Sequence, residues 1–405
     1  MLKRLAKTLL KIFTGLVLLF FVALVALFLV LSVEHHSVLT LPAPSGRFPV
    51  GRTSFHLLPS SQPARLPGTS NDLMVWIWYP AAPNTAPPAE YLPAEWRSAD
   101  AQHSGILLSK FLTRDPARVR THSTTGPPIS PEQPTYPVAI LRAGGGAFTT
   151  DFTTLAEDLA SYGYIVVGFD APYRTILFVT SDGRVIERPP SNNPENLAPP
   201  AAKHLANSLL PQWVADTETI VDYLTVVRPS QPAGQLSGHL DLQHLGMFGH
   251  SFGGATSLQF CHDDPRCKAA IDIDGAPFGS VVQEGLRQPT MFLLSDHSRE
   301  MSDPVSREIA AKLQAIYDRL PNGRLFVTLT GANHFTFSDQ ILLKSPLLIH
   351  TLQLAGPFGH LDPHRGLAIT ATYVHTFFDV YLKSAPAAQL TSLSTQFPEA
   401  QSGTP

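Results

Sequence analysis

The sequence predicts an α/β fold, a mostly parallel sheet with helices on both faces, preceded by one N-terminal transmembrane helix. Apolar runs typical of buried strands alternate with segments of helical spacing along most of the 405 residues. An uncharged run over residues 12–33 stands in front of them. Hydrophobic residues make up 44% of the chain and charged residues 15%, which excludes a mainly disordered protein. The net charge of −3 provides no basic field, so nucleic-acid partners are not expected.

The uncharged run is long enough to cross the hydrocarbon core of a membrane as a helix. We expect its N-terminal side to stay in the cytoplasm, because basic residues precede it, and the bulk of the chain to lie outside, in a periplasmic or extracellular space. The alternative is a signal peptide that is cleaved, but such peptides have a shorter apolar region and an Ala-x-Ala-like site. The preceding basic residues are Lys3, Arg4, Lys7 and Lys11.

Composition divides the chain into four parts. Residues 1–33 form a basic stub and the anchor, and the Pro/Ser-rich residues 34–72 are expected to be a tether and lead-in. Residues 73–383 carry the alternating pattern and form the α/β domain, and 384–405 are expected to be a loose tail.

Within the domain, β-rich or apolar runs predict strands, and periodic apolar positions predict helices. Strands are expected over 74–80, 137–142, 164–170, 245–250, 268–274, 289–296 and 324–330, with a hairpin over 178–187 around Asp182-Gly183. Helices are expected over 154–163, 213–227, from 253 onward, over 304–319 and over 367–382. Residues 81–135 and 188–210 are predicted to be mainly surface connections, the former with a helical patch near 106–111.

The two cysteines, Cys261 and Cys267, exclude a disulfide scaffold and a four-cysteine zinc site. In an oxidising compartment this pair can close a short disulfide. The alternative is two unpaired thiols at the end of a half-buried helix.

Ser251 lies in Gly249-His250-Ser251-Phe252-Gly253, which fits Gly-x-Ser-x-Gly directly after a strand and before a helix. Glycines allow the tight turn that lifts the serine hydroxyl clear of the sheet, and the helix N-terminus favours developing negative charge. This context predicts a nucleophilic Ser251 on an α/β-hydrolase fold, with His250 as a support residue. A purely structural turn is the alternative.

A serine hydroxyl needs a base, and the base needs an orienting acid. His334 follows the last predicted strand and fits the chain order Ser, acid, His of α/β-hydrolases. Two acids end neighbouring strands, Asp274 and Asp296, and the pattern alone does not separate them.

Four segments together resemble the platelet-activating-factor acetylhydrolase family, which includes the lipoprotein-associated phospholipase. These are GHSFGGAT (249–256), IDIDGAPFG (271–279), ANHFTFSD (332–339) and the stretch 144–170. The resemblance places the acid 23 residues after the serine, which is Asp274, and leaves Asp296 as the alternative.

An oxyanion needs two backbone donors. The N–H of Phe252, after the nucleophile, is one candidate, and the resemblance places the other at Gly145. The chain departs from the plasma enzyme of the family here, with Ala143 for a usual histidine and Gly145 for a usual larger apolar residue. The glycine is expected to enlarge the space beside the acyl group.

These expectations describe a membrane-anchored serine esterase with the triad Ser251, Asp274 and His334, needing no metal or organic cofactor. The resemblance implies short or truncated acyl esters of phospholipids as substrates. The alternatives are a general carboxylesterase or polyester-type hydrolase of the same fold, and a non-catalytic binding module.

Overall fold

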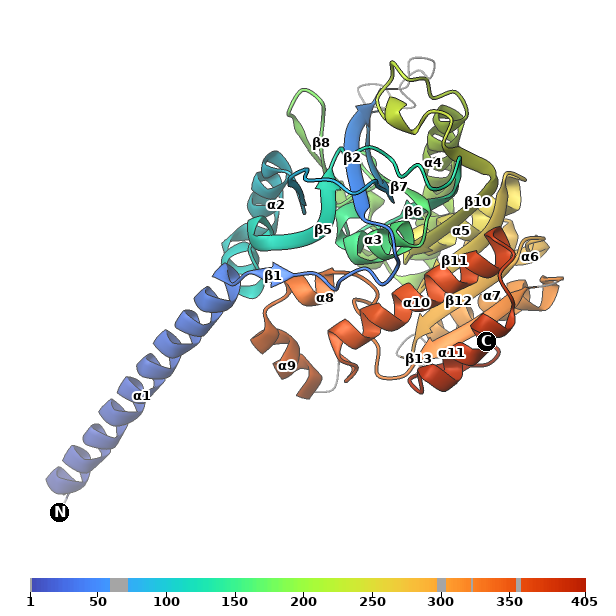
Figure 1. The fold of residues 1–405 in the computed structure, drawn as a ribbon. Helices are drawn as coiled ribbons and strands as arrows, with labels where there is room; N and C mark the ends of the chain where they lie inside the picture. Colours follow the sequence, from blue (N-terminus) through green and yellow to red (C-terminus); the bar gives the residue numbers. More distant parts are fainter. Residues whose placement is uncertain (1, 59–71, 297–303, 322, 355–357) are drawn as a thin grey trace.

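The computed structural model describes residues 2–58, 72–296, 304–321, 323–354 and 358–405, and its centre is a sheet of 12 strands (Figure 1). The strand order is β1-β5-β2-β3-β7-β6-β10-β11-β12-β13-β14, with β4 paired to β5. Neighbours from β7 to β13 are parallel, whereas β3 pairs antiparallel with β2 and β7. The strands are β1 (Leu39–Thr40), β2 (Val50–Leu57), β3 (Leu73–Pro80), β4 (Pro88–Glu90), β5 (Val119–Thr125), β6 (Tyr136–Arg142), β7 (Ile165–Asp170), β10 (Leu240–His250), β11 (Cys267–Ile273), β12 (Thr290–Ser295), β13 (Arg324–Leu329) and β14 (Ala400–Ser402).

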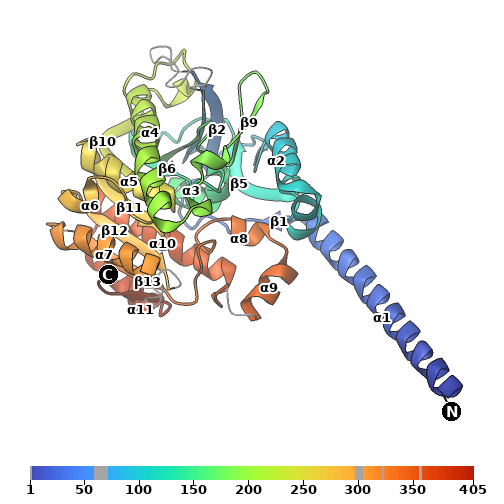
Figure 2. The ribbon, with the colours of Figure 1, turned by 180° about the vertical axis from the view of Figure 1, so that it is seen from behind.

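Helices cover both faces of this sheet, which confirms the predicted fold class (Figures 1 and 2). Two apolar cores result, one on each face: Met247 of β10 points into one and its neighbour Phe248 into the other. One face carries α3 (Thr153–Ser161), α10 (Pro363–Leu382) and α11 (Ala388–Gln396). The opposite face carries α4 (Pro199–Thr225), α5 (Phe252–Asp263), α6 (Val281–Glu284) and α7 (Pro304–Arg319).

The lead-in and the tail differ from the sequence prediction, because both contribute strands. Within 34–72, β1 and the eight-residue β2 join the sheet, and β2 pairs along its full length with β3. The tail 384–405 is not loose: it forms α11 and then β14, which pairs antiparallel with β13. This pairing covers a sheet edge that would otherwise expose unpaired backbone groups.

Two predicted connections also contain helices. Helix α4 begins at Pro199, inside the segment 188–210 that is expected to be a loop. Prolines fit the first helical positions because the backbone N–H groups there have no hydrogen-bond partner within the helix. In 81–135, helix α2 (Ala94–Leu107) is followed by a π-helical turn over Leu108–Leu112. The hairpin of β8 (Leu177–Val179) and β9 (Val185–Glu187) lies where the sequence predicts it.

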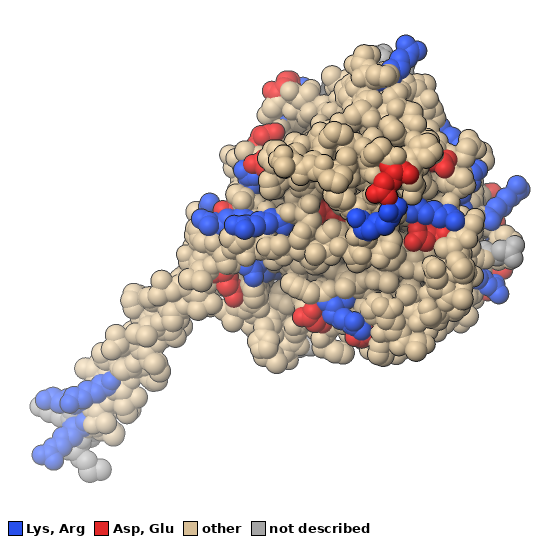
Figure 3. All heavy atoms as spheres, in the orientation of Figure 1, with Lys and Arg blue, Asp and Glu red and all other residues tan. Residues whose placement is uncertain are grey.

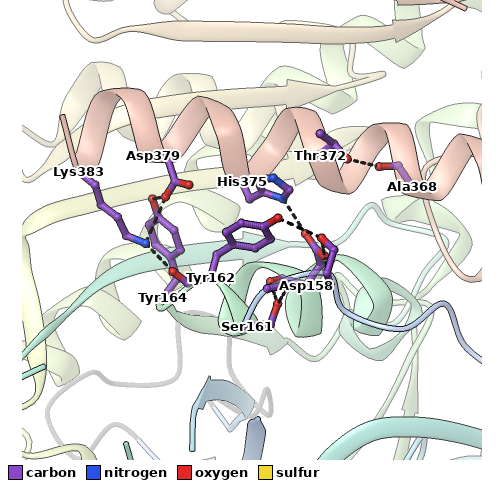
Figure 4. Close-up of polar contacts among 11 residues, drawn as sticks. Asp158, Ser161, Tyr162, Tyr164, Ala368, Thr372, His375, Asp379 and Lys383 are labelled. Carbon is purple, nitrogen blue, oxygen red and sulfur yellow. Dashed lines mark hydrogen bonds and ion pairs between the residues drawn. The ribbon is translucent and has the colours of Figure 1, made fainter. Parts of the chain in front are cut away.

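Asp158 of α3 holds the lead-in segment against the domain (Figure 4). Its carboxylate accepts hydrogen bonds from Ser45 N at 2.8 Å and Ser45 Oγ at 2.7 Å, and it pairs with His375 Nδ1 of α10 at 2.8 Å. Burial raises the pKa of Asp158, but His375 and Ser45 outweigh it, and the pKa is lowered. The His375 ring stacks on Tyr162 with centroids 3.8 Å apart. The cluster therefore joins the lead-in, α3 and α10.

Helix α1 (Leu2–His36) projects from the domain (Figure 1). Most of its apolar side chains are exposed. It is long and apolar enough to cross a membrane, although a signal sequence shares these properties. Basic side chains gather near its free end (Figure 3). At its other end, His35 Nδ1 hydrogen-bonds the Thr113 carbonyl oxygen at 2.8 Å, and Glu34 accepts from Leu347 N at 3.1 Å, so the helix is fixed to the domain.

Candidate active site

Ser251 forms the sharp turn between β10 and α5. Its backbone has φ 57° and ψ −124°, a conformation that L-residues rarely adopt and that the surrounding structure must hold. The turn is possible because Gly253 passes close to the β6 end: a Cβ there would collide with the Arg142 carbonyl oxygen. The strained turn places Ser251 at a cavity wall and at the N-terminus of α5.

His334 and Asp274 form an ion-paired hydrogen bond of 2.7 Å between Nδ1 and Oδ2. Asp274 follows β11 with a completely buried side chain, and its Oδ1 accepts from Ser295 N at 2.8 Å and Ser295 Oγ at 3.0 Å. A carboxylate can only accept, so Nδ1 of His334 carries the proton and Nε2 is left as the basic nitrogen. Burial lowers the pKa of His334, but the Asp274 hydrogen bond and charge outweigh it, and the pKa is raised above 6.5.

Asp296, the alternative acid, makes a different contact. Its Oδ2 accepts from the Gly331 N–H at 2.8 Å in the turn after β13. Of the two acids, Asp274 is the one that the structure brings onto the His334 ring.

His250 supports the loop that carries His334. Its Nε2–H donates to the His334 carbonyl oxygen at 2.8 Å, and the two rings lie 4.3 Å apart. Burial, with the neighbouring His334, lowers the pKa of His250 to about 3. His250 is therefore neutral at physiological pH and acts as a fixed donor.

The predicted residues lie around one cavity of about 700 Å³. Ser251, His334, Asp274, Phe252 and Gly145 all line it. Its far walls are largely apolar and come from α4, α7 and the loop after β11, with Leu209, Trp213, Phe278, Ile309 and Leu313.

Phe252 and Gly145, the two predicted oxyanion donors, line this cavity from separate elements. Phe252 is the first residue of α5 and has no carbonyl one turn earlier to accept from its N–H. Among the described residues, neither the Phe252 N–H nor the Gly145 N–H has a protein acceptor. Both N–H groups are therefore free to bind a ligand, and their role as an oxyanion hole stays a prediction.

The loop that carries Gly145 is held by residues that the sequence reasoning missed. Gln340 Nε2 donates to the Gly146 carbonyl oxygen at 3.2 Å and to Asp151 Oδ2 at 2.9 Å. Asp151 also accepts from Phe148 N at 2.9 Å, and burial raises the pKa of Asp151 to about 7. Gln340 directly follows the quoted ANHFTFSD segment, but no local pattern reveals that it reaches back to residue 146.

Another buried carboxyl, that of Asp272, lies near the turn that carries Ser251. Asp272 is completely buried, and a Cβ on Gly254 or Gly275 would meet its Oδ1. Burial raises the pKa of Asp272 to about 8, and the charge of Asp274 adds to the effect. Asp272 is therefore mostly protonated at neutral pH and does not compete with Asp274 for His334.

The structure joins Cys261 of α5 and Cys267 of β11 in a disulfide, with Cα atoms 5.0 Å apart. The bridge closes the turn between the helix and the strand. Neither cysteine lines the cavity.

Comparison with known proteins shows which proteins the chain resembles. A family model described as "Platelet-activating factor acetylhydrolase, isoform II" matches residues 219–389. The "Platelet-activating factor acetylhydrolase" of Cavia porcellus is 24% identical over 308 residues, which cover 71% of this chain and 68% of that protein. The "Probable 1-alkyl-2-acetylglycerophosphocholine esterase" of Arthroderma benhamiae is 24% identical over 277 residues, 65% of each chain. The chain is thus similar to platelet-activating-factor acetylhydrolases over much of its length.

The match to these acetylhydrolases spans about two thirds of their length. A "Bis(hydroxyethyl) terephthalate hydrolase" of Streptomyces coelicolor is 23% identical over 211 residues, 52% of this chain and 54% of that protein. A solved ferulic acid esterase from Streptomyces cinnamoneus superimposes with a TM-score of 0.72 at 26% identity, covering 90% of this chain and 99% of that chain.

Proposed function

We propose that the protein is a serine carboxylic-ester hydrolase that works through Ser251, His334 and Asp274. The coarse class, a carboxylic ester hydrolase, is supported by the acetylhydrolases and esterases that the chain resembles. The observation that carries the assignment of residues is the 2.7 Å contact of His334 with the buried Asp274, in the same cavity as the strained Ser251.

In the proposed mechanism, His334 Nε2 takes the proton of the Ser251 hydroxyl while Oγ attacks the ester carbonyl carbon. The N–H groups of Phe252 and Gly145 stabilise the negative oxygen of the tetrahedral intermediate. The carbon–oxygen bond to the alcohol then breaks, and His334 gives its proton to the leaving oxygen. Water, deprotonated by His334, hydrolyses the acyl-enzyme and frees Ser251.

For the substrate, we propose short or truncated acyl esters of phospholipids, supported by the names of the relatives. We also propose that α1 anchors the protein in a membrane, with its basic end in the cytoplasm and the domain on the other side. The anchor then keeps the cavity close to lipid. Signal cleavage with secretion is the alternative.

A second candidate, a hydrolase of aromatic or polyester-type esters, is favoured by the ferulic acid esterase and terephthalate hydrolase among the similar proteins. The aromatic lining of the cavity by Trp213, Phe252 and Phe278 also suits an aromatic acyl group.

The test is a panel of esters with the Ser251→Ala variant as control. It contains an acetyl-phospholipid, a long-chain phospholipid, 4-nitrophenyl acetate and an aromatic-acid ester. Faster turnover of the acetyl-phospholipid than of the long-chain phospholipid supports the first candidate, and preference for the aromatic-acid ester supports the second. If no ester is cleaved, or if Ser251→Ala cleaves them equally, the proposal fails.

A further inference from the structure

Arg188 lies beside the loop that carries Gly145. It directly follows β9, and its backbone N–H is fixed to the Ile176 carbonyl oxygen at 3.0 Å. Its guanidinium lines the same cavity as Ser251, and a Cβ on Gly145 would collide with its Nη1. The space left by the missing side chain at 145 is thus occupied by a cation. The expected enlargement beside the acyl group is wrong for this reason.

The charge of Arg188 has no counter-ion within the described part of the chain. No hydrogen bond or ion pair of its guanidinium with a described residue occurs, and Glu195 acts on it only at longer range. Burial lowers the pKa of Arg188, but Glu195 raises it in part, and a guanidinium stays charged at neutral pH. The other cavity cations differ: Lys203 and Lys312 pair with Glu308 at 2.7 Å and 3.3 Å.

A half-buried guanidinium without an acceptor loses hydration that it does not regain from the protein. Its planar fork matches the oxygens of a carboxylate or phosphate in a bidentate contact. We propose that Arg188 is a specificity residue that binds an anionic group of the ester substrate, a carboxylate or phosphate only a few bonds from the scissile carbonyl. This inference rests on the proposed function, because it places the anion next to the carbonyl held at Gly145.

The test uses ester pairs in which one member carries the anionic group and the other has that group methylated or removed. For an anionic acyl group the pair is mono-4-nitrophenyl glutarate and its methyl ester. For an anionic alcohol the pair is acetylated glycerol 3-phosphate and acetylated glycerol. The pair whose anionic member is preferred more strongly shows whether the anionic group belongs to the acyl part or to the alcohol part of the substrate.

The variants are Arg188→Gln and Arg188→Lys, with Arg184→Gln as the matched control. Arg184 lies on the same hairpin but outside the cavity, where it is exposed and pairs with Asp182 at 2.8 Å. We expect Arg188→Gln to lower kcat/KM about tenfold or more for the anionic ester of at least one pair. For the neutral partner it should stay within about threefold. Arg188→Lys should retain part of the preference, since it keeps the charge without the fork, and Arg184→Gln should leave both rates unchanged.

A second readout is independent of turnover: calorimetric binding of the same pairs to Ser251→Ala, with and without Arg188→Gln. Tighter binding of an anionic ester that disappears with Arg188→Gln supports the inference even if no ester is hydrolysed, and then only the proposed function fails. Hydrolysis without charge preference, or equal losses on neutral and anionic esters, overturns the inference and leaves the proposed function standing.

Discussion

Replacing Asp274 by asparagine removes the negative charge behind His334 and keeps the size of the side chain. Two Ser295 donors, N at 2.8 Å and Oγ at 3.0 Å, face Oδ1 of Asp274. The asparagine oxygen is therefore expected to stay toward Ser295, which turns the NH₂ group toward His334. Nδ1 of His334 must then accept, its proton moves to Nε2, and the imidazole can no longer take the proton of Ser251.

We expect Asp274→Asn to lower kcat/KM by about 10³- to 10⁴-fold, or about 4–5.5 kcal/mol of transition-state stabilisation. Asp296→Asn is the matched control: among the described residues its carboxylate accepts from the Gly331 N–H and makes no contact with His334, so a loss within about tenfold is expected. Initial rates on 4-nitrophenyl acetate, with thermal unfolding to verify folding, measure both variants. A large loss in Asp296→Asn together with near-normal activity in Asp274→Asn would refute the reasoning.

Three further predictions concern pH and stability. Because the pKa of His334 is raised and its protonated form cannot act as a base, kcat/KM should fall on acidification with a midpoint above 6.5; a midpoint near 5 in a pH–rate profile would contradict this. Asp272, with its pKa raised to about 8, binds a proton on folding, so its contribution to the free energy of unfolding falls as the pH rises from about 4 to about 8. Asp272→Asn should reduce the slope of unfolding free energy against pH by up to about 1.4 kcal/mol per pH unit. An unchanged slope in urea unfolding would count against this prediction. The Cys261–Cys267 bridge closes a short loop with a sequence separation of 6. Replacing both cysteines by serine should therefore lower the free energy of unfolding by about 2 kcal/mol and leave the activity unchanged. Loss of activity in the folded variant would contradict this.

The turn that carries Ser251 was predictable from the sequence because its signal is local. The glycines around Ser251, the apolar strand before it and the helix after it are contiguous, and they define one turn. The choice between Asp274 and Asp296 was not local, since both follow strands and only the spatial approach of the loop after β13 separates them. The family resemblance, not the pattern, favoured Asp274.

Other features depend on contacts between distant segments. Arg188 stands in a Pro/Asn-rich stretch without periodicity, and its neighbour Gly145 lies on another loop. Strand β14 is short and polar, and it becomes a strand only because β13 offers a free edge. The Pro/Asn-rich composition predicts a loop where helix α4 begins, whereas Pro199 and Pro200 form the first turn of that helix.

The central claim, that His334 makes the Ser251 hydroxyl reactive, can be tested by labelling the purified protein with a fluorophosphonate and locating the modified residue by mass spectrometry. The account predicts a single phosphonylated residue, Ser251, with labelling abolished in Ser251→Ala and strongly slowed in His334→Ala. Modification at another residue, or labelling of His334→Ala at the wild-type rate, would contradict it.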